Sequence, residues 1–112
     1  MMEMEEKGLE ENTEDTFDLK LKLGDPFLFD DMEVSELDLS GLVELSASDM
    51  CAIDRQMSVM GYSYARPEVT GQYAVLVAAR VNKKPWEYCN NMKARDYIRL
   101  REMIRAFFYA RG

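Results

Sequence analysis

The sequence contains no histidine among its 112 residues. Histidine is the commonest general base and the commonest metal ligand in proteins, so its absence excludes Ser-His-Asp and Cys-His hydrolases and any zinc site that relies on imidazole. Only two cysteines are present, Cys51 and Cys89, and they form no C-x-x-C pair. This usage is untypical of a secreted fold held by disulfides. We therefore predict reduced cysteines and no metal site.

Long apolar runs and targeting segments are also lacking. The longest wholly uncharged apolar run covers residues 73–79, far short of the ~20 residues that a membrane span needs. No cationic region followed by an apolar stretch stands at the N-terminus, so the sequence predicts no signal peptide. These absences predict a soluble, cytosolic protein that makes no contact with a membrane.

The composition that remains supports one folded domain. Hydrophobic residues make up 47% of the chain, and its length fits the roughly 100–150 residues of a common domain. The charge is unevenly placed: residues 1–56 carry 17 acids and 4 bases, whereas residues 57–112 carry 4 acids and 10 bases. Such asymmetry indicates a charged tail or an interaction surface. The net charge of −7 argues against nonspecific binding to nucleic acid.

Residues 1–15 hold seven acids, one lysine and few large apolar side chains. Such a segment cannot bury enough apolar surface to offset the entropy that ordering would cost. We therefore predict a flexible, disordered acidic arm over residues 1–15 and a single domain over residues 16–112. The simplest role for the arm is to keep the protein soluble.

An alternating pattern follows the arm and predicts a strand. Apolar side chains occupy every second position from Phe17 to Leu23, which places four of them on one face. The turn cluster Gly24-Asp25-Pro26 comes next. Because proline lacks an N–H group, we expect Pro26 to end the strand pairing.

The alternation then resumes and predicts further strands. Phe27 and Phe29 share a face, and the two aspartates at residues 30–31 form a tight connection. The apolar positions shift phase near residues 35–36, which indicates a β-bulge. We predict a short antiparallel β meander over residues 16–40, with one face that needs cover.

The next segment has the signature of a helix start. Ser46 and Asp49 have capping-box spacing, with an oxygen at the N-cap and a carboxylate three residues later. Gly61 is well placed to end this helix. Between them, apolar residues recur at three- and four-residue steps and form one helical stripe, namely Met50, Ile53, Met57 and Met60.

Three more helices are predicted in the second half of the chain. Thr70 is a candidate N-cap for a helix with apolar residues from Tyr73 to Val81, and Pro85 suits the first turn of a short helix over residues 86–91. The last helix has an apolar side formed by Tyr97, Leu100, Ile104, Phe107 and Phe108. The predicted fold is α+β, with the β meander packed on a helical body of about four α-helices over residues 46–111.

The carboxylates give no sign of a catalytic pair. Asp30, Asp31 and the acids from Glu33 to Asp38 occupy turn and solvent-facing positions, whereas acid–base catalysis needs carboxylates that converge in a pocket. The spacing of a calcium-binding loop is absent. We therefore predict no catalytic residues, no cofactor and no enzymatic activity.

The last predicted helix also carries four arginines, at positions 95, 99, 101 and 105. Arginine contacts to phosphates would give salt-dependent binding to nucleic acid. Against this, the helix has no recognisable helix-turn-helix partner, and the acidic arm would repel DNA. Arginines on the polar face of an amphipathic helix are more often solvated or paired with acids. A small nucleic-acid-binding adaptor or regulator is thus the alternative function, and nucleic acid is a disfavoured partner.

Methionine and aromatic side chains are the best candidates for contact with a protein partner. Nine methionines are many for this length, and methionine suits both irregular cores and adaptable binding surfaces. The core interpretation is favoured, but a methionine stripe beside tyrosines also fits a groove for a partner helix. The candidate partner-binding residues are Met57, Met60, Tyr62, Tyr64, Trp86 and Phe108.

The order of these segments resembles the tail assembly chaperones of long-tailed bacteriophages. In that family a short β segment, often with a proline and an apolar-x-Phe-Asp-Gly turn, precedes a helical body. The chain departs from the pattern at Asp31, where the family often has glycine. The matching segments are LKLKLGDPFLFDD at 19–31, VSELDL at 34–39, LSASDM at 45–50, YAVLVAAR at 73–80, Pro85, and a last helix at 96–108 that ends in two phenylalanines.

The resemblance implies transient binding to other proteins. Such chaperones hold the long helical tape measure protein until the tail tube polymerises around it, help to recruit tube subunits, and are absent from the finished virion. The implied partners are the phage tape measure protein and the tail tube protein, in the cytoplasm of the bacterial host. Formation of a homo-oligomer stays open. A structural tail or head-completion protein is a further alternative, which predicts incorporation into virions.

Overall fold

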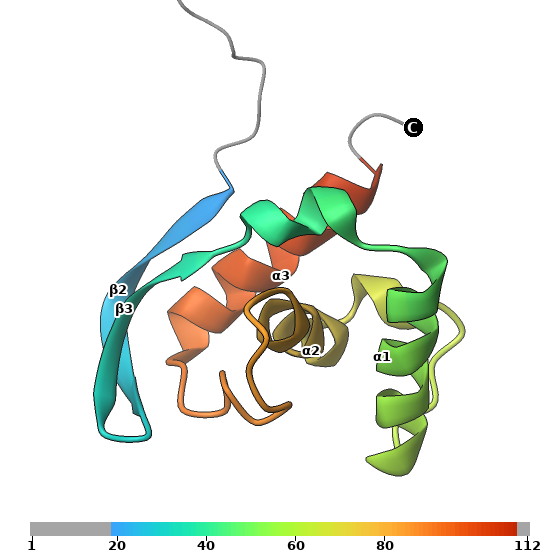
Figure 1. Cartoon of the computed structure of the whole chain (residues 1–112), viewed down its shortest axis with the longest axis horizontal. Helices are drawn as coiled ribbons and strands as arrows, with labels where there is room; N and C mark the ends of the chain where they lie inside the picture. Colours follow the sequence, from blue (N-terminus) through green and yellow to red (C-terminus); the bar gives the residue numbers. More distant parts are fainter. Residues whose placement is uncertain (1–18, 110–112) are drawn as a thin grey trace, which may run out of the picture.

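The computed structural model describes residues 19–109. The predicted acidic arm, the start of the predicted meander and the last three residues lie outside them. Figure 1 shows a β-hairpin along one edge of the molecule, α2 in the middle and α1 at the opposite end. The elements are β2 Lys20–Phe29, β3 Met32–Asp38, the 3₁₀ helix η2 Ser40–Glu44, α1 Ala47–Val59, the 3₁₀ helix η3 Pro67–Val69, α2 Gly71–Val81 and α3 Ala94–Tyr109.

The strands β2 and β3 form a two-stranded antiparallel hairpin rather than a longer meander. Phe29 pairs with Met32, so Asp30 and Asp31 alone make the connection. Both aspartates have positive φ angles, 52° and 64°. Positive φ at both central residues is the geometry of a type I′ turn, which matches the twist of the strands. The predicted α+β class and the tight connection are confirmed.

The expectation that Pro26 ends the pairing is wrong, because β2 continues to Phe29. The pairs Lys22–Glu36 and Phe27–Val34 flank a shift in register. Four residues of β2 therefore lie opposite one residue of β3. The predicted irregularity exists, but the additional residues belong to β2. Pro26 is tolerated there because a bulge residue needs no ladder hydrogen bond.

The side chain of Asp96, in the first turn of α3, holds this bulge against the helix. Its two carboxylate oxygens accept hydrogen bonds from the backbone N–H groups of Gly24 and Asp25, both at 3.0 Å. Arg99 donates to the same carboxylate at 2.9 Å. Asp96 is 2% exposed. Its burial opposes ionisation, but these donors outweigh it and lower the pKa of Asp96.

The ends of α1 follow the predicted local signals. Ser46 and Asp49 form the capping box, with the Ser46 hydroxyl accepting from the Asp49 N–H and the Asp49 carboxylate accepting from the Ser46 N–H. At the other end, Gly61 has a φ of 88°. The N–H of Tyr62 donates to the carbonyl of Met57 at 2.9 Å, which completes a Schellman motif.

Helix α2 is the centre of the core. Thr70 caps it by accepting from the N–H of Tyr73. Its buried residues lie on nearly every side, as expected for a helix that is surrounded by other elements; they are Gly71, Tyr73, Ala74, Leu76, Val77, Ala78 and Ala79. The small side chains allow α1, α3 and η2 to approach closely. At Gly41 of η2, an added Cβ would lie 3.2 Å from the Cβ of Val81.

Helix α3 packs its apolar side against α2 and the hairpin (Figure 1). Leu100 and Ile104 are fully buried, whereas Phe107 and Phe108 are half-buried. With 16 residues, α3 is the longest helix within residues 19–109. Neither α3 nor any other helix of this described part is long and apolar enough to cross a membrane.

The predicted short helix over residues 86–91 is wrong. This segment forms consecutive turns, in which the N–H of Tyr88 donates to Pro85 and the N–H of Asn90 donates to Glu87. Six residues provide too few hydrogen bonds to offset the cost of starting a helix. Tyr88 and Cys89 are nevertheless buried. Residues 19–109 thus contain three α-helices instead of about four.

Candidate functional site

Within residues 19–109, the candidate metal ligands and nucleophiles are carboxylates and two cysteines. Across these residues no cluster of three or more cysteine, aspartate or glutamate side chains could hold a metal ion. Cys51 is exposed and Cys89 is buried, and both are free thiols. Burial raises the pKa of Cys89 to about 12. A thiol in this state is a poor nucleophile.

The end of α1 brings together three of the six predicted partner-binding residues. We call Met60, Tyr62 and Tyr64 the aromatic surface. Met60 is 46% exposed, Tyr64 is 44% exposed and Tyr62 is half-buried. The two tyrosine rings are stacked, with centroids 6.0 Å apart and an interplanar angle of 21°. The positive φ of Gly61 turns the chain so that Tyr62 leaves the helix in this direction.

Two hollows adjoin the aromatic surface, and Tyr62 lines both. One has a volume of about 360 Å³ and includes Tyr64 and Pro67. The other, of about 220 Å³, lies between the end of α1, α2 and the start of α3. Its lining residues are Met60, Tyr62, Gln72, Val75, Leu76, Cys89, Asn90, Met92 and Tyr97.

The other three predicted residues lie elsewhere. Met57 is 3% exposed and belongs to the core, although it contributes to the floor of the hollow beside Tyr64. Phe108 is half-buried and packs edge-on against Tyr73, with ring centroids 6.4 Å apart. Trp86 lines a third depression. The six residues therefore do not form a single surface.

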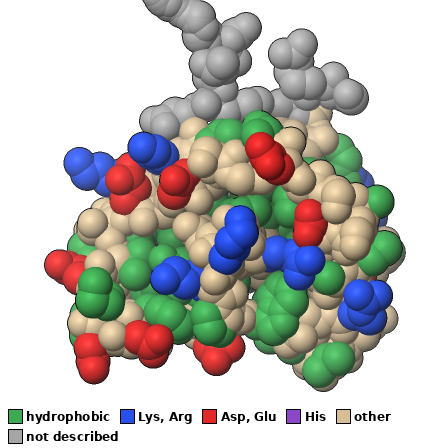
Figure 2. Space-filling model, in the orientation of Figure 1, with side chains coloured by type: hydrophobic (Ala, Val, Ile, Leu, Met, Phe, Trp, Pro, Cys, Tyr) green, Lys and Arg blue, Asp and Glu red, His purple; other side chains and the backbone are tan. Residues whose placement is uncertain are grey.

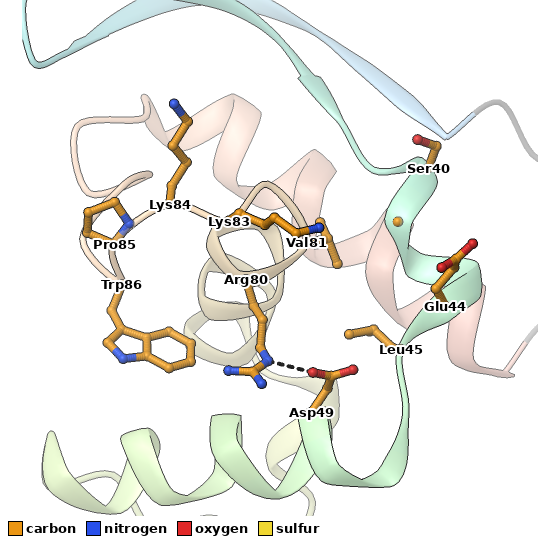
Figure 3. A pocket seen from close by; sticks show the side chains of 11 residues that line it. Ser40, Glu44, Leu45, Asp49, Arg80, Val81, Lys83, Lys84, Pro85 and Trp86 are labelled. Carbon is orange, nitrogen blue, oxygen red and sulfur yellow. Dashed lines mark hydrogen bonds and ion pairs between the residues drawn. The ribbon is translucent and has the colours of Figure 1, made fainter.

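This third depression, which we call the Trp86 groove, has a volume of about 630 Å³. It lies between η2, the start of α1, the end of α2 and the turn that follows α2. Figure 3 shows Lys83, Lys84 and Trp86 following one another around one side, and Arg80 reaching across to Asp49. The lining residues are Ser40, Gly41, Glu44, Leu45, Asp49, Arg80, Val81, Lys83, Lys84, Pro85 and Trp86.

An ion pair joins two helices across the groove. The Nε of Arg80 lies 2.8 Å from Oδ1 of Asp49. The N–H of Ser46 lowers the pKa of Asp49, and Arg80 and the Ser46 hydroxyl lower it further. One carboxylate thus caps α1 and fixes Arg80 at the end of α2. Both side chains are about one third exposed, so the pair adds modestly to stability.

The end of α2 positions the two lysines. Lys83 has a φ of 56°, and the N–H of Lys84 donates to the carbonyl of Ala79 at 2.9 Å. This is a second Schellman motif, with lysine at the position where glycine is preferred. The Nζ of Lys84 lies 5.8 Å from the centre of the Tyr88 ring. Figure 2 shows basic side chains near the middle of the face turned toward the viewer, beside apolar ones.

The arginines of α3 are mostly engaged by carboxylates on the same helix. Arg99 pairs with Asp96, and both Arg101 and Arg105 pair with Glu102. These pairs reduce the positive charge that this helix presents to a nucleic acid. The alternative of a nucleic-acid-binding regulator therefore gains no support from the geometry of α3.

Sequence reasoning did not find the Trp86 groove, the Arg80–Asp49 pair or the bonds of Asp96 to the hairpin. These contacts join residues 31 and 71–72 positions apart. The only local signal was the capping box, which predicted that Asp49 caps α1 but not that it also pairs with Arg80. Comparisons with protein-family models, with curated proteins and with solved structures find no match for this chain.

Proposed function

We propose that this protein is a phage tail assembly chaperone. It binds the tape measure protein transiently in the cytoplasm of the bacterial host, keeps the long helices of that protein soluble, helps to recruit tail tube subunits, and does not remain in the virion. The support for this proposal is the resemblance in the order of sequence motifs, together with a surface suited to binding a helix. The proposed activity is binding, without catalysis.

The aromatic surface is the observation that carries the proposal. A tape measure protein exposes amphipathic helices, whose apolar residues recur at three- and four-residue steps. Met60, Tyr62 and Tyr64 present exposed or half-exposed apolar area next to hollows that can accept such side chains. The flexible methionine can adjust to different helix sequences. Tyrosine adds contact area at a low cost in side-chain entropy.

The small number of exposed apolar residues on the aromatic surface supports transient binding. A small apolar contact gives a modest affinity for each copy, so each copy can be displaced when tube subunits arrive. Many copies along one tape measure protein still cover it, because its helices repeat the same kind of apolar face. A chaperone that must leave the assembled tail benefits from this combination.

The test is co-expression with the tape measure protein encoded in the same phage genome. We expect that the tape measure protein is insoluble alone and co-purifies with this chain. The double substitution Met60→Ser and Tyr64→Ser is expected to weaken the complex at least about tenfold, since truncating an interface anchor costs more than about 1 kcal/mol and about 1.4 kcal/mol of binding free energy is tenfold in affinity. The control is Leu28→Ser with Met32→Ser, which removes two exposed apolar residues from the hairpin.

Three results would contradict the proposal. The first is a tape measure protein that is soluble alone and forms no complex. The second is an equal loss of binding in the hairpin control. The third is tight, salt-sensitive binding to duplex DNA, which would favour a nucleic-acid regulator. Mass spectrometry of purified virions separates the remaining alternative, because a structural tail or head-completion protein would be found there.

A further inference from the structure

The Trp86 groove lies beside the point where the chain enters the described part of the structure. The N–H of Leu39 donates to the carbonyl of Leu19 at 2.6 Å. Ser40 and Gly41 follow Leu39 directly, and both line the groove. In Figure 3 the first strand begins next to Ser40. Leu19, the first described residue, therefore lies close to the rim of this groove.

The charges of this segment and of the groove are complementary. Residues 1–18 hold eight acids and one lysine, so they carry −7, equal to the net charge of the whole chain. Lys83 and Lys84 are exposed at the rim, and within residues 19–109 neither forms an ion pair. Arg80 adds a third cation, which pairs with Asp49, and Glu44 places a second carboxylate on the lining, so the groove carries three bases against two acids. Opposite charges near a shared site favour association at low salt.

The groove and the N-terminal segment also both contain apolar residues next to charged ones. Trp86, Leu45 and Val81 line the groove between its charged side chains. In the N-terminal segment, Leu9 stands between two acidic pairs at residues 5–6 and 10–11. An apolar residue flanked by acids fits an apolar wall flanked by lysines. Leu9 precedes Leu19 by ten residues, which span up to about 35 Å when extended, so the tether does not restrict its access.

We infer that the Trp86 groove is a docking site for residues 3–15 of the same chain. The acids of this segment pair with Lys83 and Lys84, and Leu9 contacts Trp86. Attachment at the rim raises the local concentration of the segment to the millimolar range, so a weak contact suffices to occupy the groove. Occupation covers the indole and withholds the groove from other acidic segments. This inference concerns a different surface from the aromatic surface and does not rest on the proposed function.

Trp86 provides the readout, because it is the only tryptophan in the chain. We would measure acrylamide quenching of its fluorescence in the full-length protein while raising NaCl from about 0.02 to 0.5 M. Over this range the Debye length falls from about 20 Å to about 4 Å. We expect quenching to rise about twofold as the segment leaves the groove. A hundredfold dilution of the protein should leave the quenching unchanged.

Variants identify the two partners of the contact. Replacing the acids at 5, 6, 10 and 11 by glutamine should give high quenching at every salt concentration. Lys83→Gln with Lys84→Gln should do the same, whereas the matched pair Lys22→Gln with Lys93→Gln should behave like the unaltered chain. Circular dichroism checks that each variant folds.

If acrylamide quenching in the unaltered chain does not change with the salt concentration, this result alone overturns the inference. Equal effects of the two lysine pairs would also overturn it, because the docking would then lack a defined site. Quenching that rises on dilution would assign the contact to a second copy of the chain instead of the same one.

Discussion

Removing the carboxylate of Asp96 should destabilise the protein by more than removing a solvent-exposed acid from the first turn of a helix would. Three hydrogen bonds of 2.9–3.0 Å end on this side chain, two from the hairpin backbone and one from Arg99. Hydrogen bonds to a charged group contribute about 1.5–3 kcal/mol each. Gly24 and Asp25 are exposed residues, so water recovers part of this energy. We expect Asp96→Ala to cost about 2–4 kcal/mol.

The pH dependence of this effect follows from the lowered pKa of Asp96. A carboxyl whose pKa is lower in the folded protein stabilises it fully above the unfolded value of about 3.9. That stabilisation is lost as the pH falls through the folded pKa. Asp96→Asn lacks it at every pH but keeps one neutral acceptor. The difference between wild type and Asp96→Asn should therefore be largest at neutral pH and shrink below about pH 4.

Urea denaturation followed by circular dichroism at pH 7, pH 5 and pH 3 measures these differences. Glu87→Gln is the control, since it removes an exposed carboxylate from a turn. We expect the control to change the free energy of unfolding by less than about 0.5 kcal/mol. If Asp96→Asn unfolds at the same urea concentration as wild type, the hydrogen bonds of the Asp96 carboxylate contribute nothing to the free energy of unfolding. A difference that stays constant down to pH 3 would refute the charge argument while leaving a packing effect.

Three further substitutions test backbone geometry and packing by the same denaturation assay. Lys83→Gly should stabilise the protein by about 0.5–1 kcal/mol, because glycine adopts the φ of 56° without strain; a loss of stability would contradict this geometry. Asp31→Gly should stabilise the type I′ turn by a similar amount, since glycine suits its second position, and an unchanged midpoint would count against it. Gly71→Ala should cost about 1–3 kcal/mol, because the added Cβ collides with the phenol of Tyr97. Wild-type stability of Gly71→Ala would mean that the phenol moves freely.

Local signals predicted most of the secondary structure correctly. The capping box of Ser46 and Asp49, the glycine at the end of α1 and the N-cap at Thr70 depend on neighbours within a few residues, so the sequence contained all the information needed. The tight turn at Asp30 was predictable for the same reason, since it joins two alternating patterns. The two strands then pair in the register that places their apolar side chains on the same face of the hairpin.

Predictions failed where local signals competed with distant contacts. Gly24-Asp25-Pro26 has the composition of a turn, but the Asp96 carboxylate accepts hydrogen bonds from the N–H groups of Gly24 and Asp25, and β2 continues through the segment as a bulge. The segment 86–91 has a helix-like start at Pro85, yet it forms turns that bury Tyr88 and Cys89. In both segments a long-range contact or burial of a few side chains outweighed weak local propensity.

The candidate surfaces were predictable only in part. The sequence identified the methionines and aromatics that could bind a partner, because their types and spacing are visible locally. It could not separate Met57, which is buried, from Met60, which is exposed, since both occupy the same helical stripe. It also gave no reason to place Arg80 beside Asp49. Exposure and convergence depend on how helices pack, not on residue type.

The sequence by itself determined the α+β class, both ends of α1, the start of α2, the turn of the hairpin and the concentration of negative charge in the first 18 residues. These features follow from local backbone preferences, apolar periodicity and composition, which act over a few residues. The tertiary structure decided that Asp96 holds the hairpin, that the aromatic surface gathers at the end of α1, and that a groove with two lysines opens beside Leu19. These features depend on side chains from distant positions, whose meeting is set only when α2 is surrounded by the other elements.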